Sequence, residues 1–540
     1  MKHFLSKFST LFLIAMILPI STMAAGKRRA PKTESADESA TRACCNRATR
    51  NACAPIPITT ITTISTPGHY CLANSLIGTG ALITIISDDV LLDLNGQFLE
   101  VISGSALEIS SVTGTGLQNI IIKNGFLTSD QSTTSTGIII DDVAFPTDLH
   151  AFHYNIVLEG LNIRLFNGTG IVANSTEKLV IECCNLDSNG QNLFVNNSAE
   201  VNLISSAFRI SLTDSSATLF ECNRTVMQNC AFTRNQFGGL TLNTCFEFYA
   251  NNCHFNDNGD SGFGNGLDGI LSTNLVFESC SFSFNNNTGM SLGDISLFNA
   301  YNCTFNENGF AGIGDGFSAI SAVPTSVIND FVFDQCTFSA NAAKGFIIEG
   351  LPGFCVGFKL LNCQAMNNTD HGFTFNNGAT DIVLENCVSS GNTPGHGFVL
   401  TTTIGSFATF IGCVASDNTD GFNMVDSLGS GVIQECKAVG NSGTGSIGFG
   451  PSLVGCGFND TADSLYQYIS CVAQGNGANP AANMVSTTTD TNYCIDGVPT
   501  EYTPITGGPG VSEPFSQLGR STFTGMFNAG ITAWDNVTLK

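Results

Sequence analysis

The feature that most constrains the fold of this chain is a cysteine with fixed neighbours that recurs about once every 23 residues. Asparagine stands five positions after each of these cysteines. Apolar residues usually stand three and five positions before it, as Phe333 and Phe331 do before Cys336. A period this short with a fixed internal phase is typical of a solenoid. The eleven positions are Cys184, Cys230, Cys253, Cys280, Cys303, Cys336, Cys363, Cys387, Cys413, Cys436 and Cys471.

The apolar residues around each cysteine predict strands rather than helices. They alternate with other residues, as in Ile382-x-Leu384, which is the two-residue rhythm of a strand with one buried face. A coil of this length accommodates three short strands and three bends, with each strand paired in parallel to its equivalent roughly 4.8 Å away. The same phase continues at four positions that lack the cysteine. We therefore predict an all-β, single-stranded parallel β-helix of about fifteen coils, and the four further positions are Gln97, Gly125, Leu161 and Ser206.

The recurring asparagines and cysteines have structural interpretations. Asparagine tolerates the left-handed backbone conformation that a sharp bend requires, and stacked amides can hydrogen bond from coil to coil. Inward side chains of parallel strands lie one strand spacing apart, slightly beyond disulfide range, so we expect the eleven cysteines to be buried thiols. Better disulfide candidates are Cys222 with Cys245, and Cys53 with Cys71 at an N-terminal cap.

Two stretches near the start of the predicted coils carry a family resemblance. Residues 68–72 (GHYCL) and 87–96 (SDDVLLDLNG) resemble the opening of pectin-lyase-like right-handed parallel β-helix proteins. The recurring F-x-x-N is also similar to the repeat of chlamydial polymorphic membrane proteins, whose G-G-A-I tetrapeptide is echoed only at Gly238-Gly239-Leu240. The resemblance covers roughly residues 58–476 and implies a right-handed parallel β-helix. It does not imply one chemistry, because pectin-lyase-like proteins include lyases, hydrolases, epimerases, adhesins and non-catalytic members.

The chain divides into four predicted segments. Lys2 and Lys7 precede an apolar run and small residues through Ala25, which predicts a cleaved signal peptide over 1–25 that is too short to span a membrane stably. Residues 26–54 form a basic flexible arm, residues 55–476 the β-helix with its N-terminal cap, and residues 477–540 a C-terminal cap or tail. We expect the mature protein to be secreted or held on the outer surface of a cell envelope, with no membrane span.

The charge of the chain limits its partners. The formal net charge is −24, and the residues after position 50 hold 41 acidic and 11 basic side chains. Such a surface repels nucleic acid and anionic membranes. It also repels polyuronates unless a divalent ion bridges them, so calcium is the one cofactor we consider. The candidate calcium ligands are Asp88, Asp89, Asp141 and Asp142, and the alternative is that these are solvated bend residues.

Three short motifs on successive coils suggest where chemistry would lie. Asn368-Thr369-Asp370, Gly395-His396-Gly397 and Asn418-Thr419-Asp420 resemble the N-T-D and G-H-G motifs of polygalacturonases. By that resemblance Asp370, His396 and Asp420 are the catalytic candidates, with the two aspartates roughly 10 Å apart, near the separation of an inverting glycosidase. The paired aspartates and R-x-K clamp of that family are absent, and the bend pattern of the repeat accounts for both N-T-D copies. We therefore assign no catalytic residue from sequence.

The function that the sequence favours is a non-catalytic, exported scaffold that binds glycans or host proteins. One alternative is a polysaccharide-active hydrolase or lyase of the pectin-lyase-like kind. Another is an envelope structural protein joined to other chains by disulfides through Cys44, Cys45 or Cys53.

Overall fold

The fold is seen in a computed structural model of the 540-residue chain. The predicted signal peptide, the basic arm and nearly all of the predicted tail lie outside the residues that the structure describes. The described residues are 56–111, 115–131, 133–141, 152–260, 264–310, 312–321, 328–350, 355–401, 406–424, 430–441, 457–460, 465–469, 471–474, 476 and 493–495.

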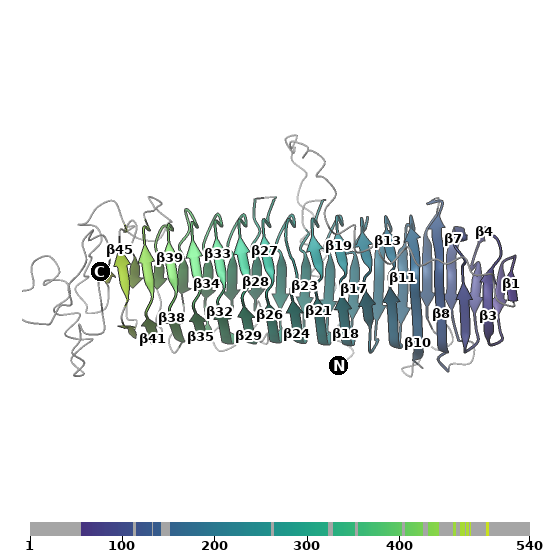
Figure 1. Ribbon diagram of the computed structural model, residues 1–540, viewed down its shortest axis with the longest axis horizontal. Helices are drawn as coiled ribbons and strands as arrows, with labels where there is room; N and C mark the ends of the chain where they lie inside the picture. Colours follow the sequence, from purple (N-terminus) through teal and green to yellow (C-terminus); the bar gives the residue numbers. More distant parts are fainter. Residues whose placement is uncertain are drawn as a thin grey trace, which may run out of the picture. The chain divides into compact units, whose positions relative to one another are not determined.

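All regular elements of the described residues are strands, and they wind into coils that stack side by side (Figure 1). Each coil passes through three parallel sheets, and each strand pairs with its equivalent on the next coil. The predicted parallel β-helix is confirmed, with about 14 turns against the fifteen expected. The described part of the chain contains no apolar helix of bilayer-spanning length.

The three sheets run the length of the stack. The first sheet holds β1 (Ile56–Ile58), β3 (Gly68–Leu72), β6 (Val90–Asp93), the starts of β8 (Gln118–Ser129) and β10 (His153–Arg164), β12 (Thr176–Glu182), β15 (Asn202–Ile204), β18 (Asn223–Gln228), β21 (Phe246–Asn251), β24 (Thr273–Glu278), β26 (Ser296–Tyr301), β29 (Ile328–Asp334), β32 (Cys355–Leu361), β35 (Ala379–Glu385), β38 (Phe407–Ile411), β41 (Ser430–Gln434) and β44 (Leu465–Ile469). The second holds β4 (Leu76–Thr79), the start of β7 (Phe98–Ile109), the ends of β8 and β10, β13 (Asn185–Asp187), β16 (Ala207–Arg209), β19 (Ala231–Thr233), β22 (His254–Asn256), β27 (Thr304–Asn306), β30 (Thr337–Ser339), β33 (Gln364–Met366), β36 (Val388–Ser390), β39 (Val414–Ser416), β42 (Lys437–Val439) and β45 (Val472–Gln474). The third holds β2 (Thr62–Ile64), β5 (Ile83–Ile85), the end of β7, β9 (Ser135–Ile140), β11 (Thr169–Asn174), β14 (Gln191–Asn196), β17 (Ala217–Phe220), β20 (Leu240–Asn243), β23 (Leu267–Ile270), β25 (Met290–Gly293), β28 (Phe317–Ile320), β31 (Phe346–Glu349), β34 (Phe373–Asn376), β37 (Phe398–Thr401), β40 (Phe422–Met424) and β43 (Phe458–Asp460), to which β46 (Tyr493–Ile495) is antiparallel.

Equivalent side chains stack inside the helix. Six phenylalanines of the second sheet form one continuous ring stack with centroids 4.7–5.0 Å apart. This spacing is that of neighbouring strands, so ring stacking follows directly from the strand register. The stack is Phe208, Phe232, Phe255, Phe282, Phe305 and Phe338.

The cysteines of the repeat lie at the first bend, between the first and second sheets. All eleven are buried and reduced, as predicted. In nine of them the sulfur lies 3.1–3.6 Å from a carbonyl oxygen of the preceding coil, as Cys336 does from Ala300 O. Burial raises the pKa of Cys184 to about 12, so the uncharged thiol is the stable form.

The predicted Cys222–Cys245 disulfide is wrong. Both residues are buried thiols on successive coils, and each donates to a carbonyl of the coil before it, Val195 O at 3.7 Å and Leu219 O at 3.3 Å. The parallel geometry that keeps the repeat cysteines apart acts on this pair too. Cys71 is disulfide-bonded, and its predicted partner Cys53 lies outside the described residues.

The repeat asparagines form a ladder at the second bend, between the second and third sheets. From Asn235 to Asn476, each Nδ2 donates to Oδ1 of the next at 2.8–3.2 Å. Each Nδ2 also donates to a backbone carbonyl, as Asn341 does to Phe305 O. The expected left-handed conformation falls on the preceding residue instead, for example Glu307 (φ 54°) before Asn308. The ladder asparagines are therefore selected by their amides rather than by their backbone.

Candidate functional site

The candidate residues lie at the second bend, one position before the glycine that immediately precedes each third-sheet strand. Backbone hydrogen bonds from these glycines place five charged or titratable residues at equivalent positions on successive coils, and we call this row the charged column. Glycine is required beside it, because a Cβ at Gly372 would collide with Ser389 Oγ and Gly397 O. The charged column consists of Asp315, Lys344, His371, His396 and Asp420.

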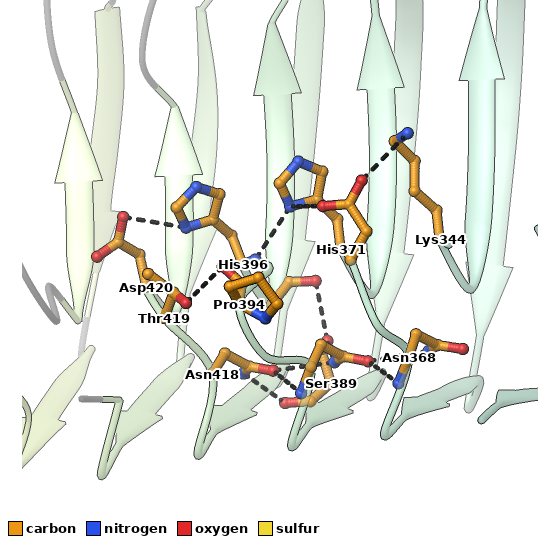
Figure 2. Close-up of polar contacts among 12 residues, drawn as sticks. Lys344, Asn368, His371, Ser389, Pro394, His396, Asn418, Thr419 and Asp420 are labelled. Carbon is orange, nitrogen blue, oxygen red and sulfur yellow. Dashed lines mark hydrogen bonds and ion pairs between the residues drawn. The ribbon is translucent and has the colours of Figure 1, made fainter. Parts of the chain in front are cut away.

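Figure 2 shows Lys344, His371, His396 and Asp420 on successive coils, and their side chains contact one another or Asp370. Lys344 Nζ lies 3.3 Å from Asp370 Oδ2, and the two imidazoles of His371 and His396 stack with centroids 5.0 Å apart. His396 Nδ1 lies 3.1 Å from Asp420 Oδ2, although the two atoms are not aligned for a hydrogen bond. The contact is therefore an electrostatic one, made by a carboxylate that is almost fully buried.

The backbone fixes the protonation of His371. Its Nδ1 accepts a hydrogen bond from the backbone N–H of His396 at 3.0 Å, so that nitrogen carries a lone pair and the proton sits on Nε2. Burial lowers the pKa of His371 to about 4; nearby Asp370 opposes the shift, and His396 and Lys344 add to it. The 3.3 Å approach of Asp370 Oδ1 to Nδ1 is thus a contact with a neutral imidazole, not a salt bridge.

Asp315, at the other end of the charged column, has a carboxyl group with a raised pKa. Burial raises the pKa of Asp315, and the hydrogen bond that its Oδ1 accepts from the backbone N–H of Lys344 at 2.9 Å acts against that rise. This carboxylate serves as an acceptor for the next coil.

The two N-T-D motifs are not structurally equivalent. Asp420 stands directly before Gly421 and so belongs to the charged column. Asp370 stands two positions before Gly372, with His371 between them, and so lies one residue ahead of the charged column. His396 does lie on the coil between the two aspartates. However, Asp370 contacts Lys344 and His371, and only Asp420 contacts His396.

The other residues of these motifs have structural contacts. Asn368 and Asn418 belong to the asparagine ladder. Thr419 Oγ1 donates to Pro394 O at 2.6 Å, and Thr369 Oγ1 donates to Asn341 O at 3.0 Å. These contacts match the interpretation that the bend pattern produces N-T-D without function.

Lys344 and His371 were not predicted from the sequence as candidate site residues. A signal for His371 was present, since His-Gly-Phe occurs twice, at 371–373 and 396–398, with the glycine at the same phase of the repeat. Nothing in the local sequence marks Lys344, whose position is set by its pairing with the preceding coil.

The calcium candidates take part in a bend of the N-terminal coils. Asp88 Oδ1 accepts from the backbone N–H of Gln118 at 2.7 Å, and Asp89 Oδ1 accepts from Asn119 Nδ2 at 2.8 Å. Asp142 lies outside the described residues. Within the described ranges, no three histidine, cysteine, aspartate or glutamate side chains gather as metal ligands would.

Comparison with solved structures finds likenesses at low identity. The A-module of mannuronan C-5 epimerase AlgE6 from Azotobacter vinelandii is 12% identical with a TM-score of 0.33, over 69% of this chain and 90% of that one. A tailspike protein of Escherichia coli bacteriophage HK620, in complex with a hexasaccharide, is 11% identical with a TM-score of 0.36, over 70% and 68%. The periplasmic alginate epimerase AlgG is 11% identical with a TM-score of 0.33, over 66% and 76%. With TM-scores below 0.5, these likenesses carry no argument about function.

Sequence comparison finds the same fold over part of the chain. No curated protein sequence matches the chain significantly. A family model described as right-handed beta helix region matches residues 149–264 and 315–455. Together with the parallel ladders of all three sheets, this match shows that the chain is a right-handed parallel β-helix protein.

Proposed function

We propose that the protein is an exported β-helix scaffold that binds glycans or proteins at a cell surface and has no catalytic activity of its own. The observation that carries this proposal is the internal pairing of the charged column. Each candidate carboxylate faces a nitrogen base of the same chain, Asp370 facing Lys344 and Asp420 facing His396.

Glycoside hydrolysis needs one carboxyl group that donates a proton and a second carboxylate that activates water or attacks the sugar. Asp370 forms an ion pair with Lys344, Asp420 makes an electrostatic contact with His396, and the two aspartates lie at non-equivalent positions of the bend. A lyase would need a strong base held free beside the substrate, whereas Lys344 Nζ is held by Asp370. The geometry supports a recognition surface better than either reaction.

Export is supported by the basic residues, apolar run and small residues of positions 1–25. A stack of short coils with reduced, buried thiols and an internal amide ladder gives a rigid framework on which bends and strand faces can present ligand-binding side chains.

The test is incubation of the mature protein with a panel of neutral and acidic polysaccharides, each with and without calcium. We expect retention of a glycan or a surface protein but neither new reducing ends nor unsaturated products. Product formation that disappears in D420N or D370N, and persists in the D334N control on the first sheet, would establish the enzymatic alternative. Absence of any retained ligand would refute the binding role.

A further inference from the structure

Five large apolar side chains are exposed together at the third bend, where the third sheet leads into the first. They occupy four successive coils, and 45–55% of each residue's surface is accessible to solvent. Single exposed apolar residues are common, but a contiguous group of this kind marks an interaction site. We call this group the apolar patch; it consists of Phe246, Ile270, Leu271, Leu297 and Ile320.

The strand register gives the apolar patch a gap at its centre. Ile270 pairs with Gly293, and Gly293 is followed in register by Ile320 on the next coil. A Cβ built on Gly293 would meet only Ile320 O, at 3.7 Å, so the space above this glycine is open. Two isoleucines about two strand spacings apart, roughly 10 Å, therefore flank a position with no side chain.

The two leucines of the apolar patch hold a backbone conformation that suits them poorly. Leu271 has φ 52° and Leu297 has φ 57°, both in the left-handed region. Polar residues hold the same positions on adjacent coils, Thr244 and Asp294 beside Leu271, and Asn274 beside Leu297. A bulky residue with positive φ is an outlier that commonly marks a functional site. Leu165, Ile210 and Phe284 hold positive φ at other bends, but Leu271 and Leu297 are more exposed than any of these three.

The charge around the apolar patch indicates the chemistry of what binds there. Residues 235–343, between Arg234 and Lys344, contain ten acidic side chains and no lysine or arginine. Glu247 is exposed beside Phe246. Asp330 is exposed at the position of Leu297 on the next coil. An apolar surface with an acidic rim is complementary to an apolar segment flanked by basic residues.

We propose that the apolar patch docks an apolar segment of another protein, flanked by lysine or arginine, with one of its side chains in the gap over Gly293. This deepens the proposed function by naming a protein ligand, and it rests on the scaffold role. A second copy of the chain is disfavoured because its acidic coils would repel these. A glycan is disfavoured because four of the five residues are branched aliphatic side chains, which offer no flat ring for stacking.

The test uses the mature chain and a fluorescent amphipathic helical peptide of leucine and lysine, with a leucine–glutamate peptide of equal length as the charge control. We expect saturable binding of the lysine peptide only. The double variant L271N/L297N, and separately G293V, should each weaken it by roughly ten-fold or more. F246N should weaken it too, whereas F407N should not, since Phe407 is equally exposed at the equivalent strand start six coils further along.

A measurement of stability distinguishes a role of Leu271 and Leu297 in recognition from a role in packing. Because asparagine suits the left-handed region better than leucine, L271N/L297N should unfold at the same or a higher urea concentration than the wild-type protein. A lower urea midpoint would show that the leucines serve the fold and would overturn the proposal. So would absence of saturable peptide binding, binding that the variants leave intact, or self-association of the wild type that L271N/L297N abolishes. Glycan retention is measured independently, so failure here leaves the scaffold proposal separately testable.

Discussion

The backbone N–H of His396 donates to Nδ1 of His371 at 3.0 Å, across two successive coils. This bond makes His371 a neutral acceptor whose only proton is on Nε2. The same coil-to-coil register brings Asp420 to His396 and Asp370 to Lys344. Lys344, His371 and Asp420 thereby each contact a residue of the same protein, although His396 Nδ1 makes no hydrogen bond. These internal contacts are why we interpret the charged column as part of the framework rather than as a catalytic centre.

The protonation state of His371 predicts an acid-sensitive fold. Its pKa is about 4 when folded and about 6.5 when unfolded, so the unfolded state takes up the proton first as pH falls. The contribution of the neutral His371 imidazole to the free energy of unfolding is complete above about pH 6.5. It is lost as pH falls toward about 4, by an amount on the order of 3 kcal/mol. Urea unfolding across this range should show a steeper loss for the wild type than for H371Q. H254Q is the control and should follow the wild type; equal slopes for H371Q and the wild type would contradict the assignment.

The asparagine ladder predicts a large cost for a small truncation. Asn341 donates to Asn368 Oδ1 and Phe305 O, and its Oδ1 accepts from the side chain and backbone of Asn308. N341A leaves these buried groups unpaired, so we expect a loss of about 3 kcal/mol or more. Equilibrium urea unfolding measures it, with N299A on the outer face of the first sheet as the control, expected within about 0.5 kcal/mol of wild type. Similar midpoints for both variants would show that the ladder contributes little.

The buried thiols predict a specific pattern of alkylation. The repeat cysteines should resist a thiol reagent in the native protein and react after unfolding without any reductant, because burial keeps them protonated and inaccessible. Peptide mass spectrometry of the labelled protein reads this out residue by residue. Recovery of a disulfide-linked peptide that joins two repeat cysteines would refute it.

The local sequence predicted the repeat architecture well, because each coil makes the same contacts as its neighbour. Alternation around Cys336 identified a strand, and the fixed asparagine five positions later identified the ladder. The spacing of parallel strands keeps the repeat cysteines apart. It keeps Cys222 and Cys245 apart as well, which is why the predicted disulfide between them is wrong.

The candidate site could be predicted only in part, because its contacts depend on loop length between coils. One additional residue before Gly372 moves Asp370 out of the position that Asp420 holds, although the two motifs are identical in sequence. Likewise, Lys344 reaches Asp370 only through the stacking of two coils, 26 positions apart in the chain. The strained leucines of the apolar patch were hidden too, since backbone φ is a property of the bend and not of the residue type.

The side chains of the charged column contact groups of the same protein, and nitrogen-15 NMR of the histidine side chains tests this claim most directly. For His371 we predict an unprotonated Nδ1, a protonated Nε2 and a pKa of about 4. A titration of His371 near pH 6.5 or above, with a proton on Nδ1, would contradict the account and reopen the column as a site of acid–base chemistry.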